Sequence, residues 1–339
     1  MPRYAFLLSP SFNRVYAKAA PPLALAELDV VREHALGDPD WTAGLTELAG
    51  NDYVTFECEP LDDVTIAVLS DLSSVYALFE QCAGGVLRPV QLADSDLFDD
   101  DLITIQRYSG KTNEQFTKLM VNVARACCAT GAATRLLDPL CGRGTTLNQA
   151  LMYGIDASGV EVDRRDHDSY ATFIRRWLKD KRLKHSAREA PVTHKAGRAR
   201  RLDVDIGRDK QSYKAGEYIV LTVVNDDTRN AAEHWGGASF DMVVTDLPYG
   251  VQHGSHRTGE LSRKPLALLE DALPVWSHLM REGASLVLSW NTLVMKRAQC
   301  RAALERVGLR VLDSHAFDRF GHRVGQAIER DLIVARKGS

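Results

Sequence analysis

The sequence LLDPLCGRGTT at residues 136–146 combines a short apolar run, an aspartate and a turn with two glycines. A strand that ends in an acid and leads through glycines into a helix is typical of ligand-binding loops in parallel α/β sheets. A helical pattern follows at residues 145–153, Gly154 ends it, and the next apolar run is at 157–161. These segments predict one β-α-β unit.

A second stretch, VVTDLPYG at residues 243–250, has a related form about a hundred residues downstream. A β-branched apolar run ends in an acid, and a proline and an aromatic residue follow, which indicates a buried strand that leads into a functional loop. In open α/β sheets, ligands bind beyond the carboxyl ends of the strands, where the strand order reverses. We therefore predict that the two loops meet across one cleft.

The pattern around these loops predicts a doubly wound, Rossmann-like α/β sheet. Thr112 and Gln115 have the spacing of a capping box at the start of a helix. Further helices are expected at 112–131, 166–178, 265–280 and 292–307, and strands at 134–138, 218–225, 240–245, 284–290, 309–315 and 327–335. No helical pattern separates the last two strands, so they should pair as a hairpin and make the last strand antiparallel.

The first part of the chain predicts a smaller α/β domain. Strand patterns at 4–8 and 53–57 alternate with a helical pattern at 22–34, where a proline pair suits a first helical turn. The acidic segment DSDLFDDD at 94–101 indicates a solvated boundary. We expect one domain over residues 1–104, with a possible RNA-binding role, and a larger one over 105–339.

Composition narrows the class of protein. The 339 residues are 45% hydrophobic, and no apolar stretch approaches the roughly 18 residues needed to span a bilayer, so we expect no membrane partner and a cytoplasmic location. The six cysteines form no CxxC pair and no zinc-type spacing with histidine, which predicts neither disulfides nor a metal site. A net charge of −3 leaves any nucleic-acid binding to a local patch.

Three strand ends carry acids in an order that suits a nucleoside-containing cofactor. Gly142 and Gly144 allow close backbone approach, and the helix that follows them offers free N–H groups. Glu161 ends the second strand, where it can accept hydrogen bonds from ribose hydroxyls. Asp226 and Asp227 follow the third strand, where a carboxylate can hold an adenine amino group. Each acid alone is equally well explained as a solvated strand end or a helix cap.

The motifs DPLCGRGT at 138–145 and DLPYG at 246–250 together resemble those of class I S-adenosylmethionine-dependent amino methyltransferases, and most closely the tRNA guanosine-N2 (THUMP-type) branch. The resemblance covers residues 105–337. It implies S-adenosyl-L-methionine (SAM) as cofactor and RNA, with tRNA favoured, as partner. The cofactor-binding residues that it implies are Thr112, Asn113, Phe116, Asp138, Pro139, Cys141, Gly142, Gly144, Thr145, Thr146, Glu161, Asp226 and Asp227.

The chain departs from this family pattern in two places. Leu247 stands where many relatives carry a first proline, and residues 179–217 lengthen the link between the second and third strands. Relatives usually carry an N-terminal THUMP module, but the pattern of residues 1–100 does not reveal one.

The second loop suits methyl transfer to an exocyclic amine. Such an amine is a poor nucleophile because its lone pair is delocalised into the ring. We expect Asp246 and the carbonyl of Leu247 to accept its protons, Pro248 to fix the backbone and Tyr249 to stack on the base. No covalent nucleophile is needed, so Cys141 is interpreted as a cofactor-loop residue. A simple turn would explain Pro248 but not the upstream motif.

A basic stretch surrounds the lengthened link. Its members are Arg175, Arg176, Lys179, Lys181, Arg182, Lys184, His185, Arg188, Lys195, Arg198, Arg200 and Arg201. It is either a solvated helix end with a flexible loop or a phosphate-binding flap beside the active site. His253, His256 and Arg257, which follow the second loop, are further candidates for contact with substrate phosphate.

The favoured function is transfer of a methyl group from SAM to guanine N2 in tRNA. One alternative is methylation of adenine N6 or cytosine N4 in DNA, which usually requires a separate sequence-reading domain. Another is a non-catalytic binding module that keeps the cofactor fold, and retention of both loops argues against it.

Overall fold

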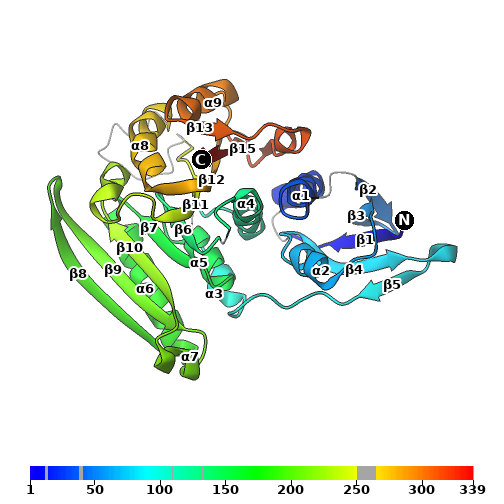
Figure 1. Ribbon diagram of the computed structural model, residues 1–339, viewed down its shortest axis with the longest axis horizontal. Helices are drawn as coiled ribbons and strands as arrows, with labels where there is room; N and C mark the ends of the chain where they lie inside the picture. The colour runs from blue at the N-terminus through cyan, green and yellow to red at the C-terminus, as the bar shows by residue number, and fades with distance from the viewer. Residues whose placement is uncertain (12–13, 38–40, 109, 132, 250–264, 339) are drawn as a thin grey trace.

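The structure is a computed structural model that describes residues 1–11, 14–37, 41–108, 110–131, 133–249 and 265–338. Within these residues the chain forms two β-sheets with helices packed on them (Figure 1). None of the helices in these ranges is long and apolar enough to cross a membrane.

The N-terminal part is an antiparallel sheet with strand order β2-β3-β1-β4-β5. Its elements are β1 (Arg3–Leu8), α1 (Arg14–His34), β2 (Thr42–Leu48), β3 (Asn51–Glu57), α2 (Asp63–Ser70), β4 (Val75–Gln81), the 3-10 turn η1 (Ala83–Gly85) and β5 (Leu87–Val90). The strands predicted at 4–8 and 53–57 are confirmed as β1 and β3. The expected helix start is wrong, because Pro21 and Pro22 lie inside α1. Burial of Tyr16, Ala19 and Ala20 in the turns before them favours the longer helix.

The larger sheet has the strand order β13-β15-β12-β11-β6-β7-β10-β9-β8, and the short β14 pairs with β15. Its strands are β6 (Arg135–Asp138), β7 (Asp156–Val160), β8 (His185–His194), β9 (Gly197–Gly207), β10 (Tyr218–Asn225), β11 (Phe240–Asp246), β12 (Met280–Asn291), β13 (Leu309–Val311), β14 (His322–Arg323) and β15 (Glu329–Lys337). The five strands from β10 to β12 in this order are parallel, and β15 is antiparallel to both β12 and β13. The predicted fold class, a Rossmann-like sheet with an antiparallel last strand beside a smaller N-terminal domain, is confirmed.

The helices of this part mostly follow the predicted positions. They are α3 (Asp101–Thr104), α4 (Glu114–Cys127), α5 (Thr145–Met152), α6 (Arg164–Asp180), α7 (Lys210–Ala215), α8 (Pro265–Leu279) and α9 (Arg297–Arg306), with 3-10 turns η2 (Thr228–Glu233) and η4 (His315–Arg319). The capping box at Thr112 is wrong. Asn113 is the N-cap of α4, and its side chain accepts a hydrogen bond from the Phe116 N–H at 3.1 Å.

The lengthened link is ordered structure. β8 and β9 form a long antiparallel hairpin, and all of β10 pairs with β9, so the hairpin extends the sheet at the edge opposite the N-terminal domain (Figure 1). Arg200 of β9 lies opposite Asn225, the last residue of β10. The hairpin tip at residues 194–197 therefore lies at the carboxyl edge of the parallel strands.

Helix α1 joins the two parts, because it packs against α4 of the larger part in one continuous apolar core (Figure 1). A buried polar network crosses the same interface. The Glu27 carboxylate of α1 accepts hydrogen bonds from the Ser73 N–H at 3.1 Å and from Asn122 Nδ2 of α4 at 2.8 Å. Asn122 Nδ2 also donates to the Asp71 carbonyl at 2.7 Å, and its Oδ1 accepts from the Tyr153 hydroxyl at 2.8 Å. Burial raises the pKa of Glu27, and the bonds from Ser73 and Asn122 oppose that rise.

We predict that Asn122→Ala lowers the free energy of unfolding by about 3 kcal/mol, because it leaves several buried polar groups without partners. Urea denaturation followed by circular dichroism measures this value. The matched control is Asn51→Ala, since the Asn51 amide makes only an exposed bond to the Ala49 carbonyl. Equal losses in the two variants would contradict a network that holds the two parts together.

Candidate active site

The two predicted loops meet at one edge of the sheet. β6 and β11 are parallel neighbours, with Leu137 opposite Val243. Thr245 Oγ1 donates a hydrogen bond of 2.9 Å to Asp138 Oδ1. The strand order reverses at β6, since β7 lies on one side of it and β11 on the other. The site therefore lies where open α/β sheets bind their ligands.

The glycine loop is shaped for close approach to a ligand. Gly144 is the N-cap of α5 with φ 78°, a left-handed conformation that favours glycine, and a Cβ there would clash with the Tyr170 ring. Among the residues that the structure describes, no side chain caps the start of α5. The first N–H groups of α5 therefore face the loop without a side-chain acceptor, and they suit an anionic group of a ligand.

Asp138 is a buried acid at the base of this loop. Burial raises its pKa to about 6, although hydrogen bonds from the Leu140 N–H, Thr146 and Thr245 lower it. Cys141 is also buried, and burial raises the pKa of its thiol well above the usual value. The thiol is therefore uncharged at neutral pH. Pro139 is buried as well, and Thr145 Oγ1 lies 3.1 Å from the Tyr108 hydroxyl.

The predicted ribose acid lies directly against the glycine loop. Glu161 follows β7, and its Oε2 accepts a hydrogen bond from the Gly142 N–H at 2.9 Å while its Oε1 accepts one from the Asp163 N–H at 2.6 Å. The carboxylate thus joins the end of β7 to the loop after β6. A carboxylate in this position could hold the hydroxyls of a ribose.

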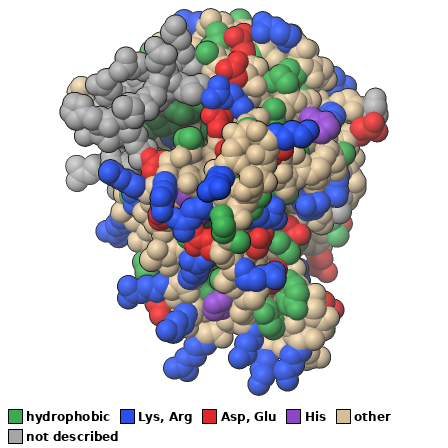
Figure 2. Space-filling view, turned by 90° about the vertical axis from the view of Figure 1, so that its left-hand side faces the viewer, with side chains coloured by type: hydrophobic (Ala, Val, Ile, Leu, Met, Phe, Trp, Pro, Cys, Tyr) green, Lys and Arg blue, Asp and Glu red, His purple; other side chains and the backbone are tan. Residues whose placement is uncertain are grey.

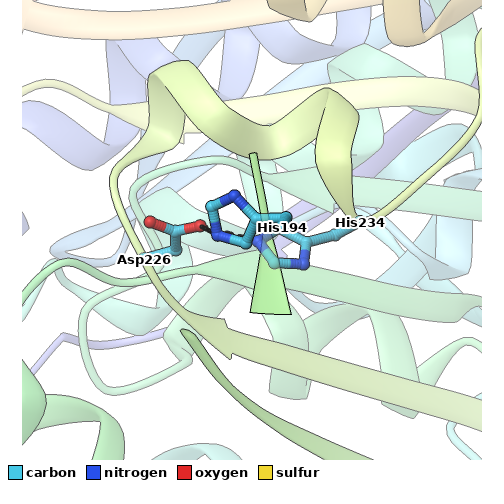
Figure 3. A group of neighbouring side chains, drawn as sticks. All are labelled: His194, Asp226 and His234. Carbon is cyan, nitrogen blue, oxygen red and sulfur yellow. Dashed lines mark hydrogen bonds and ion pairs between the residues drawn. The ribbon is translucent and has the colours of Figure 1, made fainter. Parts of the chain in front are cut away.

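Asp226 and Asp227 have different surroundings. Asp227 caps η2 and pairs with Arg229 at 2.7 Å. Asp226 Oδ1 accepts from the Asp227 N–H at 2.7 Å and from Asn230 Nδ2 at 3.0 Å. Its Oδ2 lies 2.8 Å from Nε2 of both His194 and His234 (Figure 3). Burial raises the pKa of Asp226, but the bonds from Asn230, His234 and the Asp227 N–H outweigh it, so the net shift is downward.

The Asp246 carboxylate has one fully bonded oxygen and one free oxygen. Its Oδ2 accepts hydrogen bonds from Thr112 Oγ1 at 2.8 Å, from the Tyr249 hydroxyl and from Arg330 Nη2 at 3.4 Å. Its Oδ1 is buried and has no hydrogen-bond partner among the residues that the structure describes. The free oxygen is thus the acceptor that the site offers.

The backbone of this loop is fixed by β12. The Leu247 N–H donates to the Ser289 carbonyl at 2.8 Å, and Asn291 Nδ2 lies 3.4 Å from the Tyr249 carbonyl. Leu247 is buried and Pro248 is exposed. The Tyr249 ring faces inward, and both burial and the neighbouring Asp246 raise the pKa of its hydroxyl well above the usual value.

Sequence reasoning missed Arg330 of β15. Its guanidinium lies 4.6 Å from the centre of the Phe116 ring and 5.1 Å from that of Tyr249, and Nη2 also contacts the Tyr249 hydroxyl. The side chain is only 4% exposed. Burial lowers its pKa, but Asp246, Tyr249 and Tyr16 together outweigh this effect, so the pKa of Arg330 is raised. Glu329 and Asp331 flank Arg330 in the chain, so no local pattern distinguishes it from an ordinary charged strand end.

The remaining predicted residues are dispersed around the site. Thr112 bonds Asp246, Asn113 caps α4, and Phe116 is fully buried beneath Arg330. The structure thus gives all three a place beside the acceptor loop. His253, His256 and Arg257 lie outside the described residues.

Ion pairs neutralise several members of the basic stretch. Glu189 pairs with both Arg175 and Arg200, and the other paired members are Arg176, Lys181, Arg188 and Arg201. On the face of the molecule that carries the β8–β9 hairpin, acidic side chains lie among the lysines and arginines (Figure 2). Lys195 and Arg198 at the hairpin tip are exposed, and no ion pair is found for either within the described ranges. The stretch is therefore a partly neutralised surface, and its tip keeps free charge.

Comparison with known proteins identifies the family of this chain. Residues 106–313 match the RMKL-like, methyltransferase domain family. The chain belongs to this family. It is a SAM-dependent methyltransferase, with S-adenosyl-L-methionine as its cofactor. No curated protein matches the sequence.

Several solved structures are similar in fold. TrmN from Thermus thermophilus is 12% identical, with 99% of this chain and all of that chain covered and a TM-score of 0.44. The 1,6-didemethyltoxoflavin-N1-methyltransferase of Burkholderia thailandensis is 14% identical, with 67% and 80% covered and a TM-score of 0.38. A TehB-like SAM-dependent methyltransferase from Corynebacterium glutamicum is 15% identical, with 60% and 80% covered and a TM-score of 0.33.

We predict that SAM binds more weakly as the pH falls through about 6. The raised pKa of Asp138 means that this carboxyl is mostly ionised only above that value, and we expect the loop it supports to receive the methionine end of the cofactor, which carries cationic ammonium and sulfonium groups. If only the ionised form binds well, affinity at pH 5 should be about tenfold lower than at pH 7. Calorimetric titration over this range measures the effect.

Asp138→Asn should remove most of this pH dependence, whereas the control Asp209→Asn, an exposed cap of α7, should keep it. A pH profile that is unchanged in Asp138→Asn would assign the titration to another group.

Proposed function

We propose that this methyltransferase modifies an exocyclic amine of a nucleobase, with guanine N2 in tRNA as the favoured target. The family membership supports methyl transfer, and the acceptor geometry supports an amine. The observation that carries the proposal is the Asp246 carboxylate, which has one oxygen held by three donors and one buried oxygen without a partner among the described residues.

An unpaired buried carboxylate oxygen is costly, by about 1–3 kcal/mol or more for a charged group. An amine N–H that bonds to Oδ1 removes this cost and leaves the three bonds to Oδ2 intact. The same bond draws a proton of the amine toward Asp246, which localises the nitrogen lone pair. The acceptor is thus preorganised for a donor with two protons on a planar ring.

The backbone beside Asp246 adds a second acceptor. Because the Leu247 N–H is bonded to Ser289, the orientation of the following peptide is constrained, and Pro248 restricts it further. We assign the Leu247 carbonyl to the second proton of the amine. Asp246 Oδ1 then takes the proton that the nitrogen loses after it has gained the methyl group.

The other half of the site would hold the cofactor, which supplies an electrophilic methyl group when bound. The left-handed Gly144 and the uncapped start of α5 fit its methionine end, and Glu161 fits its ribose. For the adenine amino group we favour Asp227. Asp226 already faces two donors and two histidines, whereas Asp227 Oδ2 faces only Arg229 among the described residues.

Tyr249 would stack on the target base, as the resemblance implies. Its hydroxyl now bonds Asp246 and its ring lies on Arg330, so stacking on a base requires the ring to turn outward. Thr112 and Arg330 would still hold Asp246 Oδ2 after that change. Stacking contributes roughly 1–3 kcal/mol per base and would help to hold an unstacked nucleotide.

RNA docking is assigned to two further regions. We propose that residues 1–104 form a domain that helps to bind RNA and that residues 105–339 form the catalytic domain. The free cations at the hairpin tip, Lys195 and Arg198, lie at the carboxyl edge of the sheet, where the active-site loops also lie. They are placed to contact substrate phosphates near the site.

We predict that Asp246→Ala and Asp246→Asn reduce methyl transfer by at least about 1000-fold, because each removes the acceptor of the amine proton. Nucleoside mass spectrometry of total RNA and DNA from cells with and without the gene identifies the substrate. The same RNA or DNA, incubated with purified variants, then gives the rates.

The control for Asp246 is Asp313→Asn, an exposed acid paired only with Arg301. SAM affinity should change little in every variant. Loss of cofactor binding in Asp246→Asn would assign the second loop to the cofactor, and a methylated amine found only in DNA would replace the RNA proposal.

We predict that the double variant Lys195→Ala/Arg198→Ala binds RNA more weakly and lowers the slope of log affinity against log salt concentration by about 1.5, since each lost phosphate contact removes roughly 0.7–0.9. Fluorescence anisotropy with a labelled tRNA at several salt concentrations measures the slope. The matched control, Lys210→Ala/Lys214→Ala on α7, removes two exposed cations at the far end of the hairpin. Equal slopes in both double variants would exclude the tip as the docking surface.

A further inference from the structure

Three side chains of types that can bind metal ions come from separate segments and converge beside the edge of the sheet. His194 ends β8 at the hairpin tip, Asp226 follows β10, and His234 follows η2 (Figure 3). Both histidine Nε2 atoms lie 2.8 Å from Asp226 Oδ2. The three ligand atoms all lie within 4.8 Å of one another. Two imidazoles and a carboxylate are a donor set that suits Zn²⁺ and related ions.

The group is shielded from solvent and from other cations. The exposed fractions of the His194, Asp226 and His234 side chains are 4%, 11% and 0%. In the part of the chain that the structure describes, no lysine or arginine pairs with Asp226. The nearby group His167, Asp168 and Glu189 differs in this respect, since Arg200 already pairs with both of its acids.

Among the described residues, Asp226 Oδ2 faces only the two histidines, and His234 Nε2 forms a hydrogen bond of 2.8 Å with it. The Asp227 N–H and Asn230 Nδ2 both donate hydrogen bonds to Oδ1. In metal sites, hydrogen bonds to one carboxylate oxygen orient the other oxygen toward the ion. His194 Nε2 lies close to Oδ2 but makes no hydrogen bond with good geometry to any described residue. A buried imidazole nitrogen is thus aimed into the group and left unsatisfied.

We propose that His194, Asp226 and His234 bind one divalent transition-metal ion, with Zn²⁺ as the preferred species. A tetrahedral ion with bonds of about 2.0–2.1 Å fits once the three atoms separate by a few tenths of an ångström, and it keeps one position for a water molecule. The spacing of histidines and cysteines did not predict this site, because its two histidines lie on different elements that are far apart in the chain.

Ion binding has two local costs. The hydrogen bond of 2.8 Å between His234 Nε2 and Asp226 Oδ2 is exchanged for bonds to the ion. The Ala196 N–H donates to His194 Nδ1 at 3.3 Å, and coordination through Nε2 places the proton of the neutral ring on Nδ1. That bond is then lost, at about 1 kcal/mol. Binding free energies of structural zinc sites are on the order of 10 kcal/mol or more, so even a much weaker site overcomes these costs.

The bound ion would tie the hairpin tip to the loop after β10. Lys195 and Arg198 flank the tip, and Asp227 is next to Asp226 in the chain. The site is therefore a structural one that fixes the tip beside the proposed adenine pocket. The proposal stands independently of the substrate, since metal binding needs no methyl transfer.

Titration of the chelator-treated full-length protein with Co²⁺, followed by displacement with Zn²⁺, tests the site. We expect about one Co²⁺ per chain, with the visible absorption of a tetrahedral N/O site that Zn²⁺ abolishes. His194→Ala and Asp226→Asn should each weaken binding by about 100-fold or more, because even residues that only orient ligands change affinity 10- to 100-fold. His185→Ala, at the opposite end of β8, is the matched control and should bind normally.

Trypsin digestion gives a second readout. Zn²⁺ should slow cleavage after Lys195 and Arg198 severalfold in the parent protein and in His185→Ala but not in His194→Ala. Absence of stoichiometric binding, or equal binding by His194→Ala and His185→Ala, would overturn the proposal. In that case the role of the histidines is to contact the Asp226 carboxylate, without a metal ion.

Discussion

The carboxylate of Asp246 is the constraint on which the acceptor side of the site depends. A buried charge must be paired and hydrogen-bonded, and the donors here come from three distant places in the chain. Thr112 precedes α4, Tyr249 follows β11, and Arg330 belongs to β15. The charge is satisfied only when these elements pack in one arrangement, and that arrangement determines which oxygen remains free.

Helix α4 links this site to the N-terminal domain. Thr112 lies at its start, and Asn122 in its middle bonds the buried Glu27 of α1. A rotation of the N-terminal domain would disturb this buried network, which is costly because its groups have no access to solvent. The two domains therefore hold a fixed relative position.

Local patterns in the sequence predicted the parallel core, because each strand and each loop there has its own signal. The strand at 218–225 and the meeting of the Asp138 and Asp246 loops are confirmed. Interactions between distant segments were not predictable in this way. Thr112 has the spacing of a cap, yet its hydroxyl bonds an acid on another element, and Arg330 has no local motif at all.

The hairpin was missed for a different reason. In β9, buried Leu202, Val204 and Ile206 alternate with more exposed polar residues, which is the period of a strand. The many charges around them favoured a solvated loop. The sequence around β9 does not reveal that β9 pairs with β10. One face of the hairpin is buried only when that sheet is present.

The position of β15 has a consequence for the order of assembly. This strand lies between β12 and β13, although both precede it in the chain. The parallel strands and the glycine loop can form from earlier segments, but Arg330 reaches Asp246 only after β15 has inserted between its neighbours. On a ribosome, the glycine loop can therefore form before the Asp246 carboxylate gains its contact with Arg330.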